Sequence, residues 1–155
     1  MIPLALSTVI VLLSAWWGNA VETYRWEPIG YFGFRADGLS IPVVFTVALL
    51  CSVIAIYSMP YMIHRIGGSS KDHGLYFMLY LFYSAGMIGT VLATNLIQFY
   101  LFFELMLVPS YFLIARWGYG DRDRISFMYF IWTHVGALAL LAGILTPVSY
   151  THLTL

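Results

Sequence analysis

The sequence contains a series of apolar runs, each about long enough to form a membrane-spanning helix. The runs cover residues 2–17, 39–62, 75–94, 96–115 and 125–145, and the first is slightly shorter than the others. An α-helix rises about 1.5 Å per residue, so about 20 apolar residues cross the hydrocarbon core of a bilayer. The runs therefore predict an all-α membrane protein, a bundle of about five transmembrane helices with no strands.

Composition supports a membrane protein and excludes several other classes. Of the 155 residues, 61% are hydrophobic and 9% are charged, and the mean hydropathy is +0.85. A soluble domain carries about a quarter charged residues, so the lipid bilayer is the expected environment. The net charge is zero and there is no basic tract, so nothing indicates a nucleic-acid partner. The single cysteine, Cys51, lies inside an apolar run, and we expect it to be a small core residue.

The run at 2–17 is open to two interpretations. It could be a cleaved signal peptide, since small residues follow it at cleavage-like spacing. However, the first basic residue is Arg25, so the segment lacks the basic start of a signal peptide. Trp16 and Trp17 are typical of the aromatic belt where a helix leaves the membrane. We therefore favour a retained span.

One apolar helix, at residues 101–118, contains both an acid and a proline. An ionised acid at the middle of a bilayer costs roughly 2.5–3.5 kcal/mol, so Glu104 is a candidate functional residue. Pro109 has no N–H to offer the carbonyl of Leu105, which adjoins Glu104, and its ring pushes against that carbonyl. A helix keeps such a distortion where protein or internal water satisfies the carbonyl. The pattern predicts a hydrated spot inside the membrane.

The loops indicate the orientation of the chain. Those at 64–74 and 116–124 hold five of the seven Lys and Arg residues, and a polar loop at 18–38 holds the other two. We therefore expect the loops at 64–74 and 116–124 on the cytoplasmic side and the loop at 18–38 at the opposite interface. At the end of the 18–38 loop, Asp37 or Ser40 is expected to cap the next helix.

Small, aromatic and histidine residues are the remaining candidates. Packing faces are predicted at Ala85, Gly89 and Ala93, and at Gly136, Ala139 and Gly143. We interpret Tyr76, Tyr80 and Tyr83, which follow helical spacing, as interfacial or packing aromatics and not as a cofactor site. His64 and His73 lie in a loop without further metal ligands, so we interpret them as solvated and expect no metal site. His134 lies in the first half of the 125–145 run. We favour a buried neutral histidine hydrogen-bonded to a neighbouring helix, with a proton relay as the alternative.

The end of the chain does not continue the pattern. Pro147 is expected to stop the last helix, and nothing after it is apolar enough to span a membrane. We interpret residues 1–145 as the transmembrane domain and residues 146–155 as a truncated or non-native tail.

Three segments carry a resemblance to a known family. RADGLSIP, FYLFFELMLVPSYFLIARWG and RISFMYFIWTHVGALALLAGI resemble chain M (subunit 4) of the proton-pumping NADH-quinone oxidoreductase, respiratory complex I. The run FELMLVPSYFLI is the most specific, because it combines the acid, the proline and their flanks in a fixed order. The resemblance extends from about residue 25 to 145 and identifies an antiporter-like membrane subunit.

The resemblance implies a role for Glu104 and a longer protein. In this family the matching glutamate is the proton-carrying acid of an antiporter-like half-channel. The family's chain is about three times longer, with an inverted repeat of helices, so this sequence is expected to hold only the opening helices of a partial repeat. In the family, the lysine that partners this glutamate is expected in the part of the longer chain that this sequence does not include. His134 stands where relatives usually have an uncharged residue, so no role is implied for it.

The expected function is therefore proton translocation in a quinone-reducing respiratory dehydrogenase. The chain would lie in a prokaryotic cell membrane beside other membrane subunits and its own missing C-terminal half, with quinone bound elsewhere in the complex. No redox cofactor is expected in this chain, because it has no Gly-rich nucleotide loop, cysteine cluster or haem-ligand pair.

Other functions remain open at this stage. A subunit of a multisubunit sodium/proton antiporter or of a membrane-bound hydrogenase has the same acid-proline helix. A haem- or quinone-binding protein using His134 needs a second intramembrane histidine, which the sequence lacks. A structural subunit would need a fixed cation for Glu104, and Arg116 lies about 18 Å away along one helix.

Overall fold

The structure is a computed structural model, and it describes residues 20–26, 30–66 and 70–153. A β-hairpin is followed by four long helices. The elements are β1 (Ala20–Trp26), β2 (Gly30–Ala36), α2 (Ser40–Ile66), α3 (Ser70–Leu92), α4 (Leu96–Trp117) and α5 (Arg122–Leu153). The predicted span at 2–17 lies outside the described residues.

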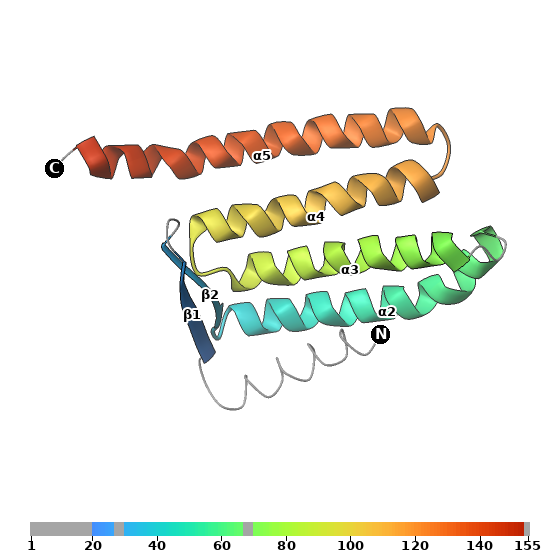
Figure 1. Cartoon of the computed structure of the whole chain (residues 1–155), viewed down its shortest axis with the longest axis horizontal. Coiled ribbons are helices and arrows are strands. Elements are labelled where there is room, and N and C mark those ends of the chain that lie inside the picture. Colours follow the sequence, from blue (N-terminus) through green and yellow to red (C-terminus); the bar gives the residue numbers. More distant parts are fainter. Residues whose placement is uncertain (1–19, 27–29, 67–69, 154–155) are drawn as a thin grey trace.

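The four helices lie side by side in one row, with the hairpin across one end (Figure 1). Each helix packs against its neighbour in the sequence and runs antiparallel to it. All four are long and apolar enough to cross a membrane. The predicted all-α membrane fold is thus confirmed for the spans that the structure describes.

Residues 20–26 and 30–36 pair as two strands where the sequence predicted a polar loop, so the prediction of no strands was wrong. The two strands are antiparallel, with Ala20 opposite Ala36 and Trp26 opposite Gly30. Both arms are rich in β-branched and aromatic residues, which favour strands. A hairpin alone is marginally stable in water, so this one depends on the helices that it packs against.

A buried glutamine joins the hairpin to the helices. The side-chain amide of Gln98, on α4, donates to the carbonyl of Gly33 at 2.7 Å and accepts from its N–H at 3.1 Å. The Thr94 hydroxyl also lies 3.2 Å from the Gly33 carbonyl. Gln98 is 1% exposed, and these bonds satisfy polar groups that would otherwise be buried without partners.

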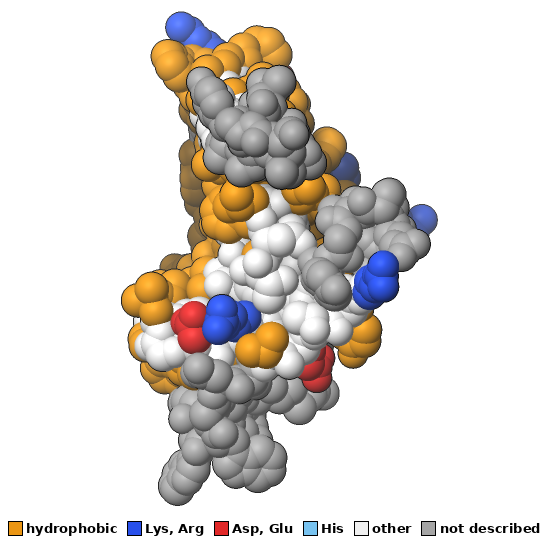
Figure 2. All heavy atoms as spheres, turned by 90° about the vertical axis from the view of Figure 1, so that its left-hand side faces the viewer, with side chains coloured by type: hydrophobic (Ala, Val, Ile, Leu, Met, Phe, Trp, Pro, Cys, Tyr) orange, Lys and Arg blue, Asp and Glu red, His pale blue; other side chains and the backbone are white. Residues whose placement is uncertain are grey.

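Aromatic rings complete the contact between the hairpin and the helices. The rings of Phe32 and Phe34 on β2 lie 6.1 and 5.7 Å from the ring of Phe102 on α4. Figure 2 looks onto this end of the molecule, where a few acidic and basic side chains lie near the hairpin and hydrophobic side chains cover the flanks. The hairpin is therefore anchored at the end where α3 connects to α4.

The start of α2 confirms the predicted cap. The carboxylate of Asp37 accepts from the N–H of Ser40 at 2.9 Å and from that of Leu39 at 3.1 Å. In return, the Ser40 hydroxyl accepts from the N–H of Asp37 at 2.8 Å. These bonds satisfy N–H groups that the first turn of a helix leaves without partners.

Two core predictions are also confirmed at the α2–α3 contact. Cys51 is buried, and its carbonyl accepts a 2.7 Å hydrogen bond from the hydroxyl of Tyr80 on α3. One turn earlier on α3, the Tyr76 hydroxyl donates to Ser58 at 3.1 Å. A tyrosine inside a protein needs such a partner for its hydroxyl, and these two are packing aromatics.

The contact between α3 and α4 uses small residues, but only part of the predicted set. Gly89 lies against Phe102, whose ring an added methyl group would overlap, so this part of the prediction is confirmed. Ala85 is exposed, and the adjacent Gly86 makes the contact with α4 instead. A Cβ at Gly86 would overlap the backbone of Met106. Helix crossing selects one of two adjacent small residues, and spacing alone did not identify it.

The predicted packing face of α5 is exposed in the described part of the chain. Gly136, Ala139 and Gly143 are exposed, and the two glycines have no neighbouring atoms where a Cβ would lie. The buried positions in this region are Ala137 and Ile144. These two lie seven residues apart, on one face of the helix, and they face away from the predicted side.

The helix α5 also continues through Pro147 to Leu153, so the predicted stop at Pro147 was wrong. Proline leaves the carbonyl four residues earlier, that of Gly143, without its helical donor. The hydroxyl of Thr146 donates to this carbonyl at 3.0 Å and so replaces the missing bond. The helical backbone can then pass the proline.

The two basic loops meet at the end opposite the hairpin. Arg65, at the end of α2, donates to the carbonyl of Gly118 at 2.9 Å and lies 4.0 Å over the ring of Tyr119. Arg116, at the end of α4, forms a 2.6 Å ion pair with Asp72 at the start of α3. These contacts support the prediction that both loops share one side of the membrane.

Candidate proton-carrying site

Glu104 lies in the middle of α4, at membrane depth. Asn95 caps the N-terminus of the helix: its side chain accepts a hydrogen bond from the N–H of Gln98 at 2.6 Å. Glu104 is the only acid in this helix, and its side chain is 25% exposed. Pro109 is buried, and the helix is continuous through it. The predicted distortion at Pro109 stays a prediction.

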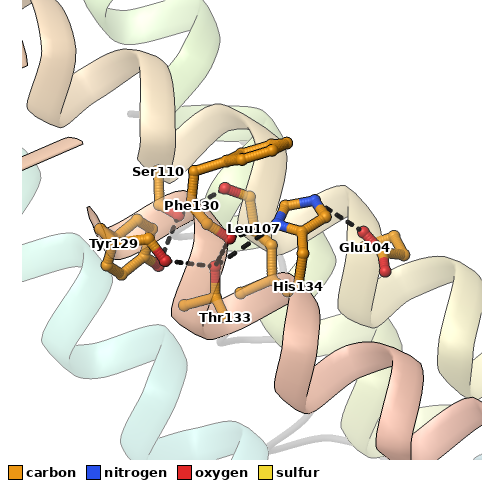
Figure 3. Close-up of polar contacts among 7 residues, drawn as sticks. All are labelled: Glu104, Leu107, Ser110, Tyr129, Phe130, Thr133 and His134. Atoms are coloured by element: carbon orange, nitrogen blue, oxygen red, sulfur yellow. Dashed lines mark hydrogen bonds and ion pairs between the residues drawn. The ribbon is translucent and has the colours of Figure 1, made fainter. Parts of the chain in front are cut away.

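Glu104 contacts a titratable residue of the neighbouring helix, His134 on α5. The histidine Nε2 lies 3.5 Å from Oε2 of the carboxylate, and the two side chains point toward each other across the α4–α5 contact (Figure 3). Glu104 lies 13 residues before the end of α4, and His134 lies 12 residues after the start of α5. In antiparallel helices joined by a short loop, these positions fall at the same depth.

The other ring nitrogen of His134 is bound within its own helix. Nδ1 lies 2.9 Å from the backbone carbonyl of Phe130, one turn earlier. A carbonyl only accepts hydrogen bonds, so Nδ1 carries its hydrogen in this geometry. In the neutral imidazole, Nε2 is then the nitrogen with a free lone pair, and it faces Glu104. The Phe130 ring lies 3.9 Å from the imidazole and limits its rotation.

A pair of hydroxyl groups joins α4 and α5 between Glu104 and the loop. Ser110, six residues after the glutamate, lies 2.8 Å from the hydroxyl of Tyr129 and also donates to the carbonyl of Leu107 at 2.7 Å. Thr133 donates to the Tyr129 carbonyl at 2.7 Å (Figure 3). The bond between Ser110 and Tyr129 fixes the approach of the two helices near the Glu104–His134 contact.

A groove of about 400 Å³ lies among α2, α3 and α4 at the basic end of the bundle, and neither Glu104 nor His134 is among its lining residues. Its lining includes Arg65 and Tyr119 at the loop end, and Tyr83 and Ser110 nearer the middle of the helices. The phenols and hydroxyls along it supply hydrogen-bonding groups at membrane depth.

Other interpretations of the polar residues find less support. Arg116 pairs with Asp72, so it is not a fixed cation for Glu104. Within the described part of the chain, no group of three or more His, Cys, Asp or Glu residues could hold a metal. His64 and His73 lie at the loop ends of α2 and α3, at a distance in sequence and depth from His134.

Two family models match different parts of the chain. The model for the transmembrane region of the NADH:quinone oxidoreductase/Mrp antiporter family matches residues 93–154, which include both Glu104 and His134. The model for the N-terminus of chain 5 of NADH-ubiquinone oxidoreductase (complex I) matches residues 26–70. The chain belongs to the antiporter-like membrane subunits of this family. Its α4 and α5 thus lie in the antiporter region of the family.

Curated relatives agree with this assignment of the antiporter family. F420H2 dehydrogenase subunit M of Methanosarcina mazei is 30% identical over 79% of this chain and 24% of its own length. NAD(P)H-quinone oxidoreductase chain 4 2 of Thermosynechococcus vestitus is 35% identical over 80% of the chain and 22% of its own length. NADH-quinone oxidoreductase subunit M of Rickettsia conorii is 30% identical over 95% of this chain and 30% of its own length. The chain spans 22–30% of the length of these three relatives.

The predicted site residues of this antiporter-like chain are only partly brought together. Glu104 and His134 are in contact, whereas Pro109 lies more than a helical turn from the carboxylate along α4. Sequence reasoning missed the contact, although the matching depths of the two residues were a usable signal. It also missed the bond between Ser110 and Tyr129, for which no sequence pattern exists.

Proposed function

We propose that this chain is part of a proton-translocating membrane subunit of a complex I-type dehydrogenase, with Glu104 as its proton carrier. The observation that supports this most is the single carboxylate in the middle of α4, within the region matched by the antiporter family model. The contact of the carboxylate with His134 on α5 places a titratable group beside it. A carboxyl held at membrane depth near a titratable partner can take up and release a proton without covalent chemistry.

Redox chemistry is assigned to other parts of the complex. The relatives are named for three different electron donors, F420H2, NAD(P)H and NADH, although they resemble this one chain to similar degrees. A subunit that is alike across different donors has no role in choosing the donor. Its partners are then the remaining membrane subunits, the rest of its own longer chain and the bilayer of a prokaryotic cell, and quinone binds elsewhere.

The test is the Glu104→Gln variant of the full-length protein in the assembled complex. Glutamine keeps the size and a hydrogen-bonding end but cannot release a proton. In proteoliposomes, proton translocation per electron should fall at least about 10-fold, since a positioned acid–base group contributes 10²–10⁴-fold. Glu22→Gln, an exposed change in the hairpin, is the matched control and should pump as the native protein does. Normal pumping by Glu104→Gln would reject the proposal.

A subunit of a sodium/proton antiporter is the second candidate, because the matching family model also covers Mrp antiporters. A membrane-bound hydrogenase subunit is a related alternative. The same proteoliposomes distinguish the dehydrogenase from the sodium/proton antiporter. Quinone-dependent proton uptake supports the dehydrogenase, and proton movement driven by a sodium gradient without any electron donor supports the antiporter.

A further inference from the structure

We propose that His134 is the group with which Glu104 exchanges its proton. The inference rests on the proposed function of Glu104 and adds its partner within this chain. It is carried by the contact of 3.5 Å between Nε2 and Oε2, which joins two helices at the same depth of the membrane. His134 is then a second acid–base residue of the site and not merely a packing residue of α5.

The hydrogen-bonding pattern of the imidazole supports this role. Because Nδ1 donates to the carbonyl of Phe130, the proton-accepting position of the neutral ring is Nε2, on the side of Glu104. The same bond holds the ring in place while Nε2 gains and loses its proton. A histidine with a merely structural role would need no free nitrogen beside a carboxyl group.

The transfer itself is a balanced proton exchange. The O–H bond of protonated Glu104 breaks and an N–H bond forms at Nε2 of His134, which gives a carboxylate and an imidazolium. At 3.5 Å the atoms are slightly too far apart for a good hydrogen bond, so the side chains approach or one water bridges them. The products are opposite charges, and each stabilises the other in a medium of low dielectric constant.

The surroundings supply no competing cation within the part of the chain that the structure describes. The titratable groups that contact Glu104 or the residues next to the pair are phenols: Tyr100 beside Glu104, Tyr111 against the Phe130 ring, Tyr129 on Ser110 and Tyr83 near Tyr129. Every Lys and Arg of the described helices lies in a first or last turn. In these four helices, His134 is therefore the group that can balance the charge of Glu104.

The experiment compares His134→Gln with native protein in the full-length subunit of the assembled complex. Glutamine is similar in length to histidine and keeps a hydrogen-bonding amide near the position of Nε2, but it cannot accept a proton. We expect proton translocation per electron to fall about 10-fold or more while quinone reduction continues. In infrared difference spectra, the C=O band of a protonated carboxylic acid, assigned by its loss in Glu104→Gln, should grow at neutral pH. Trp132→Phe, at a highly exposed position two residues away, is the control and should change neither readout.

Native pumping and an unchanged carboxyl band in His134→Gln would overturn the inference. If Glu104→Gln still abolished pumping, the proposed function would stand and only the role of His134 would fall. Should His134→Gln fail to assemble, Glu104→Asp provides the second test. It withdraws the carboxylate from Nε2 by about one C–C bond, 1.5 Å, and leaves the histidine intact. We expect a similar loss of pumping, and a native rate in Glu104→Asp would also overturn the inference.

Discussion

The side-chain amide of Gln98 pairs with the backbone of Gly33 through two hydrogen bonds, of 2.7 and 3.1 Å, as a neighbouring strand would. This contact holds the hairpin on the helices. It also places a buried polar anchor two turns before Glu104 on the same helix. The hairpin and the candidate site are thus linked through α4.

Replacing Gln98 with leucine should detach the hairpin. The N–H of Gly33 would lose its side-chain partner, which costs about 1–3 kcal/mol for a buried group, and the Gly33 carbonyl would keep only the hydroxyl of Thr94. We expect a clear fall in the thermal unfolding midpoint in detergent and faster proteolysis of residues 20–36. Leu96→Ala, at an exposed position at the start of the same helix, is the control. Equal stability of both variants would contradict the anchor.

Gly89 and Gly86 should tolerate no side chain. A methyl group at Gly89 would overlap the ring of Phe102, and one at Gly86 would lie 2.7 Å from the backbone nitrogen of Met106. Each change to alanine should therefore destabilise the packing of α3 on α4, as measured by the unfolding midpoint. Gly74→Ala, in the same helix but with no atom within 4 Å, should be neutral or slightly stabilising.

The cap of α2 should weaken at acid pH. Hydrogen bonds from the backbone and side chain of Ser40, and from the backbone of Leu39, hold the pKa of Asp37 below its ordinary value of 3.8. A lowered pKa means that the ionised cap stabilises the fold above about pH 4, and this contribution is lost as the pH falls through the folded pKa. The Asp37→Asn variant should lack this pH dependence when unfolding is followed between pH 6 and pH 3. A native-like pH dependence in Asp37→Asn would assign it to another group.

The two basic loops should be accessible from one side of the membrane. In a Cys51→Ala background, cysteines at His64 and Tyr119 should react with the same impermeant reagent from the cytoplasmic side, and one at Thr23 only from the other. All three positions are exposed. Labelling of positions 64 and 119 from opposite sides would contradict the contact of Arg65 with the α4–α5 loop.

The sequence by itself determined the four described spans, a cap of α2 at Asp37 or Ser40 and the position of Glu104 inside an apolar helix. These features follow from local causes: apolar length, the hydrogen-bonding of a first turn and the cost of a charge in a bilayer. The continuation of α5 through Pro147, where the sequence predicted a stop, also has a local cause. The hydroxyl of the neighbouring Thr146 replaces the hydrogen bond that proline lacks.

Only the tertiary structure decided which residues meet. The hairpin became stable because Gln98, from 65 residues further along the chain, satisfies Gly33, and a local pattern contains no such partner. Likewise, the choice of Gly86 over Ala85 depends on how α3 crosses α4. The contact between Glu104 and His134 depends on both the equal depth and the rotation of two antiparallel helices. Depth can be counted in a sequence, but rotation is set by side-chain packing between helices, which only the folded chain contains.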